Sequence, residues 1–123
     1  MEIQNYIDGA FVAPVSGQTM DNINPATGKV YGTIPRSDKR DVAAAVEAAK
    51  KAFPSWSRLS AGERSSWLLK VANRIEERME ELALAESTDN GKPLKLARSV
   101  DIPRARDNFK FYATAILHDA YET

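Results

Sequence analysis

Cysteine is absent from the 123-residue sequence. Without a thiol, the chain can form no disulfide, no thiolate zinc site and no covalent intermediate on sulfur. Histidine is scarce as well, since His118 is the only one and lies near the end of the sequence. A Ser/His/Asp triad would have to use His118 as its base. The alternative is a solvated histidine at a helix end.

A surplus of charge and a long hydrophobic run are also lacking. Seventeen Lys and Arg residues balance seventeen Asp and Glu residues, so a phosphate backbone finds no basic surplus and we expect no nucleic-acid partner. The first six residues contain no positively charged segment followed by an apolar core, and no stretch approaches the length of a membrane span. We therefore expect a cytoplasmic protein with no membrane partner.

Glycine-rich phosphate loops are missing too, because the six glycines occur singly along the chain. One His and no Cys leave no metal-ligand spacing. Four glutamates could pair for acid–base chemistry or could form the solvated face of a helix. They are Glu76, Glu77, Glu80 and Glu81. The residues thus indicate no self-contained active site.

The first third of the sequence is rich in turn formers and predicts short strands. Asp8-Gly9 between two β-prone runs indicates a hairpin over residues 4–13, because both turn positions must accept a positive φ. A second strand pair is expected at residues 19–23 and 30–34, joined through the Asn-Pro-Ala-Thr-Gly segment at 24–28.

From Ser37 or Asp38 the apolar residues change to a helical period, and Pro54 should end this first helix. Its expected inward positions are Val42, Val46, Ala49 and Phe53. Ser60 and Glu63 then fit a capping box at the start of a second helix. The expected buried stripe of that helix is Trp67, Leu68, Val71, Ile75 and Met79.

The segment at residues 89–93, Asp-Asn-Gly-Lys-Pro, should end one helix and start another. Residues 94–121 have helical composition, in which Pro103 must either kink the helix or lie in a first turn. Candidate inward positions are Leu94, Ala97, Val100, Phe109, Tyr112 and Ile116. The chain is thus expected to form β-ribbons in residues 1–36 and three or four helices in residues 37–123.

Several of these segments together resemble the N-terminal region of NAD(P)-dependent aldehyde dehydrogenases in order and spacing. The matching stretches are Asn5 to Gly9, Ile23 to Gly28, Asp41 to Phe53 with Trp56, Asp89 to Pro93, and Phe109 to Ala113. The stretch Asp101 to Ala105, with Leu117 and His118, is similar to the aminomuconate and hydroxymuconate semialdehyde dehydrogenase branch. The resemblance covers essentially the whole chain.

The resemblance implies an α/β subunit with a Rossmann-like NAD(P)-binding domain, a catalytic domain and a β-arm that builds homodimers and tetramers. Residues 1–123 would be the truncated N-terminal part of the cofactor-binding domain. In this family a cysteine attacks the aldehyde, hydride passes to the nicotinamide, and a glutamate-activated water releases the acid. An asparagine side chain and the cysteine amide hold the oxyanion.

All catalytic groups and the loops that hold NAD or NADP would lie beyond residue 123 in the family pattern. We therefore expect neither dehydrogenase activity nor dinucleotide affinity from these residues alone, and a role as scaffold and substrate-funnel wall. The alternative is an independent helical binding or assembly module without enzymatic activity. The ending at residues 119–123, without a closing strand or cap, favours truncation. Apolar helix faces left uncovered should then promote self-association.

Two kinds of site follow from the resemblance. Some relatives hold a structural sodium or potassium ion with positions that match the backbone carbonyl of Ile23 and the carboxylate of Asp89, although Asp89 could instead cap a helix end. Relatives acting on carboxylated semialdehydes place an arginine, matching Arg104, at the substrate entrance. Val100 and Asn108 would lie one turn to either side. A surface arginine without a partner is the alternative.

Overall fold

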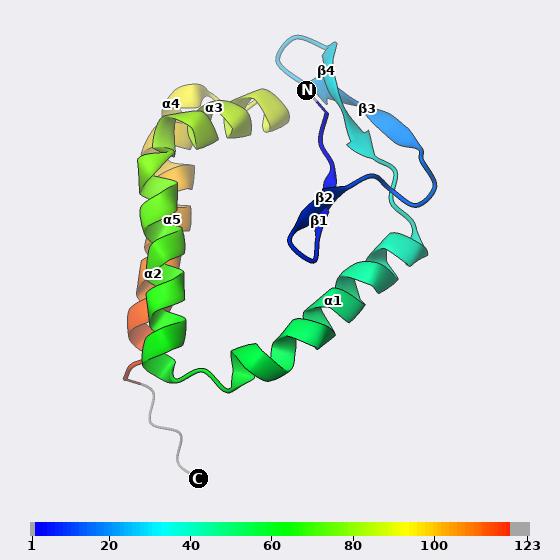
Figure 1. Ribbon diagram of the computed structural model, residues 1–123. Helices are drawn as coiled ribbons and strands as arrows, with labels where there is room; N and C mark the ends of the chain where they lie inside the picture. Colours follow the sequence, from blue (N-terminus) through cyan, green and yellow to red (C-terminus); the bar gives the residue numbers. More distant parts are fainter. Residues whose placement is uncertain (1, 119–123) are drawn as a thin grey trace. The chain divides into compact units, whose positions relative to one another are not determined.

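The computed structural model describes residues 2–118 and divides the chain into two compact units, with the boundary after Ser57. The first unit contains β1 (Asn5–Ile7), β2 (Ala10–Val12), β3 (Thr19–Asn24), β4 (Lys29–Pro35) and α1 (Lys39–Ser57). The second contains α2 (Ala61–Glu77), α3 (Met79–Asn90), α4 (Leu94–Leu96), the π-helical turn η1 (Ala97–Asp101) and α5 (Ile102–Ala115) (Figure 1). The predicted order of short β-ribbons followed by helices is confirmed.

The strands form two separate antiparallel hairpins. In the β1–β2 hairpin, Asp8 and Gly9 have φ values of 51° and 83°, as a turn with two positive-φ residues requires. The rings of Tyr6 and Phe11 face each other across the strands, edge to face, with centroids 5.1 Å apart. Strand β3 pairs with β4, and the register shifts after Asn22.

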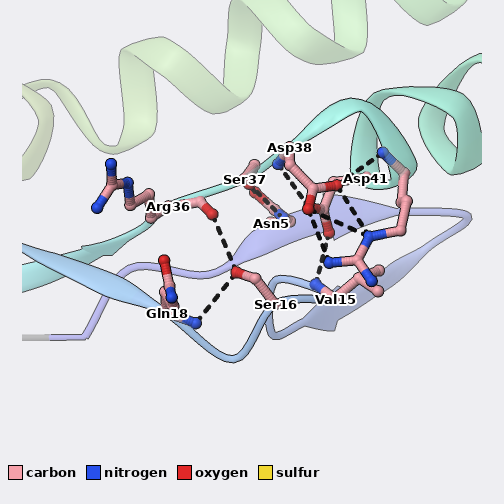
Figure 2. Close-up of polar contacts among 9 residues, drawn as sticks. Asn5, Val15, Ser16, Gln18, Arg36, Ser37, Asp38 and Asp41 are labelled. Atoms are coloured by element: carbon pink, nitrogen blue, oxygen red, sulfur yellow. Dashed lines mark hydrogen bonds and ion pairs between the residues drawn. The ribbon is translucent and has the colours of Figure 1, made fainter.

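A buried carboxylate ties the first turn of α1 to the loop that follows β2. Asp41 is 4% exposed, and its two oxygens accept hydrogen bonds from the amides of Val15 and Asp38, each at 2.8 Å (Figure 2). Asp38 in turn accepts from the amide of Arg40 at 2.8 Å and from its guanidinium, whose hydrogen bond lowers the pKa of Asp38. Two carboxylates thus occupy the positive end of the helix dipole.

Helix α1 does not end at Pro54 as predicted, but continues to Ser57. Proline removes one backbone donor, but its own φ is compatible with a helix, so a short last turn can follow it. The hydroxyls of Ser55 and Ser57 donate to the carbonyls of Ala52 and Pro54 in this turn. These side-chain bonds occupy carbonyls that a longer helix would pair with amides.

The predicted inward face of α1 is exposed. Val42, Val46 and Phe53 are 61%, 46% and 64% exposed, and Ala49 is exposed as well. The apolar period identified the helix correctly because it is a local property of the sequence. Burial requires a second surface, and within the first unit the described residues leave this face open.

In the second unit, α2 and α5 lie side by side and run in opposite directions (Figure 1). Their contact is lined by small residues, since Ala72 on α2 and Ala113 on α5 have no exposed surface and Ser65 is 4% exposed. Ala83 on α3 and Ala97 on η1 are also fully buried. Small side chains let helix backbones approach closely, so the core of this unit is built from alanine.

The predicted buried stripe of α2 is wrong at two of its five positions. Trp67 and Val71 are 51% and 41% exposed, and the ammonium of Lys70 lies 4.1 Å from the centre of the Trp67 ring. Leu68, Ile75 and Met79 are half-buried. The contact face of α2 is rotated toward Ser65 and Ala72, because α5 packs against the small residues.

Helix α2 begins at the predicted capping box. The Ser60 hydroxyl accepts from the Glu63 amide at 3.2 Å, and the Glu63 carboxylate accepts from the Ser60 amide at 2.8 Å. This backbone hydrogen bond holds the pKa of Glu63 below its usual value. The N-terminus of α2 is therefore satisfied by its own side chains.

The predicted boundary at residues 89–93 is confirmed. Helix α3 ends at Gly91, whose φ of 76° lies in the left-handed region and whose amide donates to the Ser87 carbonyl at 3.0 Å. The Ser87 hydroxyl donates to the Lys92 carbonyl at 2.7 Å, and the Lys92 amide donates to the Asn90 side chain at 2.8 Å. The chain is thus held at the turn that leads into α4.

None of the helices described combines the length and the apolar character that crossing a bilayer demands. His118 is exposed in the turn after α5, as expected for a solvated helix-end histidine. The stretch 119–121, at the end of the predicted last helix, lies outside the described residues.

Replacing Asp41 with Ala should lower the free energy of unfolding by about 2–3 kcal/mol, because the amides of Val15 and Asp38 lose their acceptor. Denaturant unfolding measures the loss, and faster hydrogen exchange at Val15 would localise it. Asp21→Ala, at an exposed position on β3, is the control and should change stability little. Equal losses in both variants would contradict this role of Asp41.

Gly91→Ala should cost about 1 kcal/mol, because a β-carbon is strained at the positive φ of this position. Gly91→Asn should cost less, since asparagine tolerates the left-handed region. Gly62→Ala is the matched control, because a β-carbon at Gly62 in α2 meets open space. Thermal unfolding of the three variants compares them, and indistinguishable behaviour of the two alanine variants would refute the role of Gly91.

Candidate substrate-entrance site

The helical stretch from α4 to α5 contains a π-helical turn directly before Pro103. The amide of Ile102 donates to the Ala97 carbonyl, five residues back, which defines η1. Pro103 lies in the first turn of α5 and has no amide to offer the Ser99 carbonyl. Of the two placements predicted for Pro103, the structure shows the first turn. Such π turns are frequent at functional sites because they re-aim side chains.

Two ion pairs hold the two ends of η1. At its start, the Arg98 guanidinium binds the Glu80 carboxylate of α3 through two nitrogens, with the Nη2 contact at 2.8 Å. At its end, Asp101 accepts from the Lys92 ammonium at 2.6 Å. Ala97, the first residue of η1, is fully buried. Ion pairs to residues outside the turn therefore stabilise it at the point where the backbone hydrogen bonds depart from the α-helical pattern.

The predicted entrance residues Val100, Arg104 and Asn108 follow one another at four-residue intervals along η1 and α5. Residues at this spacing share one side of a helix, and all three are exposed. Arg104 makes no hydrogen bond or ion pair with any residue in the range 2–118. Its guanidinium is thus available to a ligand from outside the described chain.

The neighbouring Arg106 is engaged in a different way. It pairs with Glu76 of α2 and with Asp107, the latter at 2.7 Å, and its side chain is 21% exposed. These hydrogen bonds raise the pKa of Arg106 and lower that of Asp107. Arg106 thus ties α5 to α2, whereas Arg104 projects from the same helix without such a tie.

The four glutamates considered for acid–base chemistry form ion pairs instead. Each is exposed and each binds an arginine, which leaves no two carboxylates facing one another as an acid–base pair. The pairs are Glu76–Arg106, Glu77–Arg74, Glu80–Arg98 and Glu81–Arg78. The prediction that these glutamates lie on a solvated helix face is therefore correct in that all four are exposed, but it did not include their arginine partners.

A small apolar hollow of about 170 Å³ lies between α2 and α5. Leu68 contributes from α2, and Asn108, Phe109 and Tyr112 contribute from α5. Phe109 and Tyr112, predicted as inward, are 37% and 63% exposed, and Val100 is 40% exposed. Leu94 and Ile116, by contrast, are half-buried. Asn108 borders both the hollow and the line of residues through Arg104.

The two residues expected at a cation site lie in different units. Ile23 is on β3, paired with Val30, and Asp89 is exposed in the last turn of α3, two residues before Gly91. In the part of the chain that the structure describes, no three His, Asp or Glu side chains gather as metal ligands. A sodium or potassium site made from one carbonyl and one carboxylate stays a prediction.

The start of α1 does not offer the free amides that the phosphates of a dinucleotide need. The link from β4 to α1 is the place where a strand enters a helix, and a pyrophosphate would need free amides there. The amides of Asp38 and Arg40 are already taken by the carboxylates of Asp41 and Asp38 (Figure 2). These negative charges would also repel a phosphate.

Sequence patterns missed the pair Lys92–Asp101 and the π turn beside it. The two partners are nine positions apart and a helix boundary lies between them, so no helical period connects them. Pro103 was the available signal, because it interrupts the backbone ladder at this point. Which residue binds the side chains at such an interruption depends on tertiary contacts, and the proline does not specify it.

Comparison with known proteins gives one consistent result. The family model described as the aldehyde dehydrogenase family matches residues 11–123. The chain is 49% identical over 120 residues to 2-aminomuconic semialdehyde dehydrogenase of Bos taurus, covering 98% of this chain and 24% of that protein. It is 45% identical to long-chain-aldehyde dehydrogenase of an Acinetobacter species, covering 94% of this chain and 23% of that protein.

The structural comparison agrees with the sequence comparison. The NAD+ complex of aldehyde dehydrogenase from Bacillus cereus superposes with a TM-score of 0.94 at 38% identity, over 100% of this chain and 26% of that one. The chain thus spans about a quarter of the length of the relatives it matches. With the family model matching all but the first ten residues, the chain belongs to the aldehyde dehydrogenase family.

Proposed function

We propose that this chain is the N-terminal part of an NAD(P)-dependent enzyme that oxidises a carboxylated semialdehyde to a carboxylic acid. The observation that carries the proposal is the family match over residues 11–123, together with an exposed arginine on α5, Arg104, that has no partner among residues 2–118. In this assignment the chain contributes scaffold and one wall of the substrate entrance. The aldehyde is bound and converted in the complete protein.

Arg104 supports a carboxylated substrate. A guanidinium presents parallel N–H donors that match the two oxygens of a carboxylate, and such bidentate bonds are strong and directional. Bos taurus 2-aminomuconic semialdehyde dehydrogenase is named for a substrate that carries one carboxyl group as well as an aldehyde. The long-chain-aldehyde dehydrogenase among the relatives is named for an apolar substrate, so the family alone does not select the carboxylate.

The neighbours of Arg104 suit a passage rather than a reaction centre. Val100 offers apolar surface one turn before it, and the Asn108 amide offers a donor and an acceptor one turn after it. No thiol is present anywhere in the sequence to attack an aldehyde. The chain's own residues can therefore bind and orient the far end of a substrate while the carbonyl reacts elsewhere.

The remaining assignments follow from the family and concern the complete protein. The nicotinamide accepts a hydride when bound, and the Bacillus cereus relative is described as an NAD+ complex. A homodimer or homotetramer in the cytoplasm, and a structural sodium or potassium ion at Ile23 and Asp89, complete the proposal. The exposed apolar faces of α1 and α2 suit a segment that packs against further parts of a larger subunit.

The purified 123-residue chain should produce no NADH from any aldehyde in the presence of NAD, because no cysteine is available to form the thiohemiacetal. NADH absorbance measures the product, and the complete protein is the positive control. Isothermal titration should likewise show no NAD binding to the chain. NADH formation by the chain alone would support an independent activity and remove the scaffold assignment.

Arg104→Ala in the complete enzyme should raise KM for a carboxylated semialdehyde about tenfold or more, because hydrogen bonds to a charged group are lost. KM for a neutral aldehyde of similar length should change little. Lys110→Ala is the matched control, since Lys110 is an exposed cation on α5 that lies on another side of the helix from Arg104. Steady-state kinetics compare the two substrates, and an equal effect on both would defeat the proposed role.

A further inference from the structure

Arg104 is flanked by two aspartates at the positions from which a helix side chain reaches an arginine. Asp101 lies three residues before it and Asp107 three residues after it. On a helix, side chains three residues apart are neighbours, and an Asp–Arg pair at this spacing is favourable. The backbone at Asp101 is helical, with φ −71° and ψ −51°, so this spacing holds across the start of α5. An internal pair with Arg104 would be expected on either side.

Both aspartates are bound to other cations. Asp101 accepts from the Lys92 ammonium at 2.6 Å, and Asp107 accepts from Nε of Arg106 at 2.7 Å. In residues 2–118, Arg104 has no carboxylate partner of its own. Among these residues Arg104 is therefore free, while each nearby carboxylate is bound by a different cation.

We propose that Lys92 and Arg106 keep Arg104 available to a substrate carboxylate by binding the two aspartates that would otherwise pair with it. The inference rests on the proposed function, because it assumes that Arg104 binds a carboxylate. Lys92 and Arg106 are then positioning residues for substrate specificity and touch no reacting atom. The internal carboxylates are competitors of the substrate, and these two cations remove them from the competition.

The competition follows from effective concentration. A carboxylate held three residues away on the same helix meets Arg104 without the loss of translational freedom that a diffusing substrate undergoes. Even a weak internal pair therefore reduces the fraction of Arg104 that is free, and the apparent affinity for substrate falls by that fraction. Without Lys92, the carboxylate of Asp101, whose side chain is 24% exposed, would have Arg104 as its helical neighbour.

Lys92 is the better of the two residues to test. Arg106 also binds Glu76 and so joins α5 to α2, which would mix packing effects with any effect on specificity. Lys92 lies in the turn between α3 and α4 with its side chain 38% exposed, and the ion pair with Asp101 is its side-chain contact. Its backbone bonds to Ser87 and Asn90 survive a change of side chain.

The experiment compares two variants of the complete enzyme that break the same ion pair in opposite ways. Lys92→Met leaves the carboxylate of Asp101 without its cation, and should raise KM for a carboxylated semialdehyde roughly two- to fivefold, the effect of an exposed competing pair. Asp101→Asn removes the competitor and should leave that KM unchanged or lower. KM for a neutral aldehyde and kcat for both substrates should stay near wild type in each variant.

The double variant Lys92→Met/Asp101→Asn should restore the wild-type KM, because no free carboxylate remains beside Arg104. A purely structural ion pair predicts the reverse, with both single variants impaired alike and the double variant not rescued. Lys95→Met is the matched control, since Lys95 is an exposed lysine on the neighbouring α4. Circular dichroism and thermal unfolding check the fold, and Lys92→Arg, which keeps the charge, should behave as wild type.

The result separates this inference from the proposed function. If Arg104→Ala affects carboxylated and neutral substrates alike, the proposed function fails. If Arg104→Ala is selective but Lys92→Met and Asp101→Asn raise KM equally, the inference alone is overturned. If Lys92→Met raises KM only for the carboxylated substrate and Asp101→Asn restores it, the result supports both the proposed function and this inference.

Discussion

The missing amide of Pro103 is the constraint on which the candidate site depends. Because Pro103 cannot donate to the Ser99 carbonyl, the backbone enters α5 through a π turn, and its ladder is irregular where the entrance residues begin. Stability at this point comes from contacts made at a distance. Arg98 binds Glu80 at one end of the turn and Asp101 binds Lys92 at the other.

Packing in the second unit leaves room for this arrangement. Alanines fill the contacts among α2, α3, η1 and α5, so the backbones approach closely and the large side chains project outward. Trp67, Phe111 and Tyr112 remain more than half exposed. A segment that covers about a quarter of its relatives' length and presents this much apolar surface has the character of one part of a larger subunit.

Charge is distributed so that almost every acidic group near α5 has a basic partner. Four glutamates of α2 and α3 bind arginines, and the aspartates beside Arg104 bind Lys92 and Arg106. Exposed ion pairs of this kind contribute little to stability one by one. In the site that we propose, they would decide which guanidinium is left for a ligand. Zero net charge is therefore compatible with a local cationic site.

The sequence by itself determined the features that depend on neighbouring residues. Asp8-Gly9 specified a hairpin, Ser60 and Glu63 a helix start, and Gly91 a helix end, because turns and caps are local geometry. The order of the sequence motifs along the chain was sufficient to identify the family. Only the tertiary structure decided which helix faces are buried and which aspartate binds which cation. Those outcomes depend on surfaces and partners brought together by folding, and no local period encodes them.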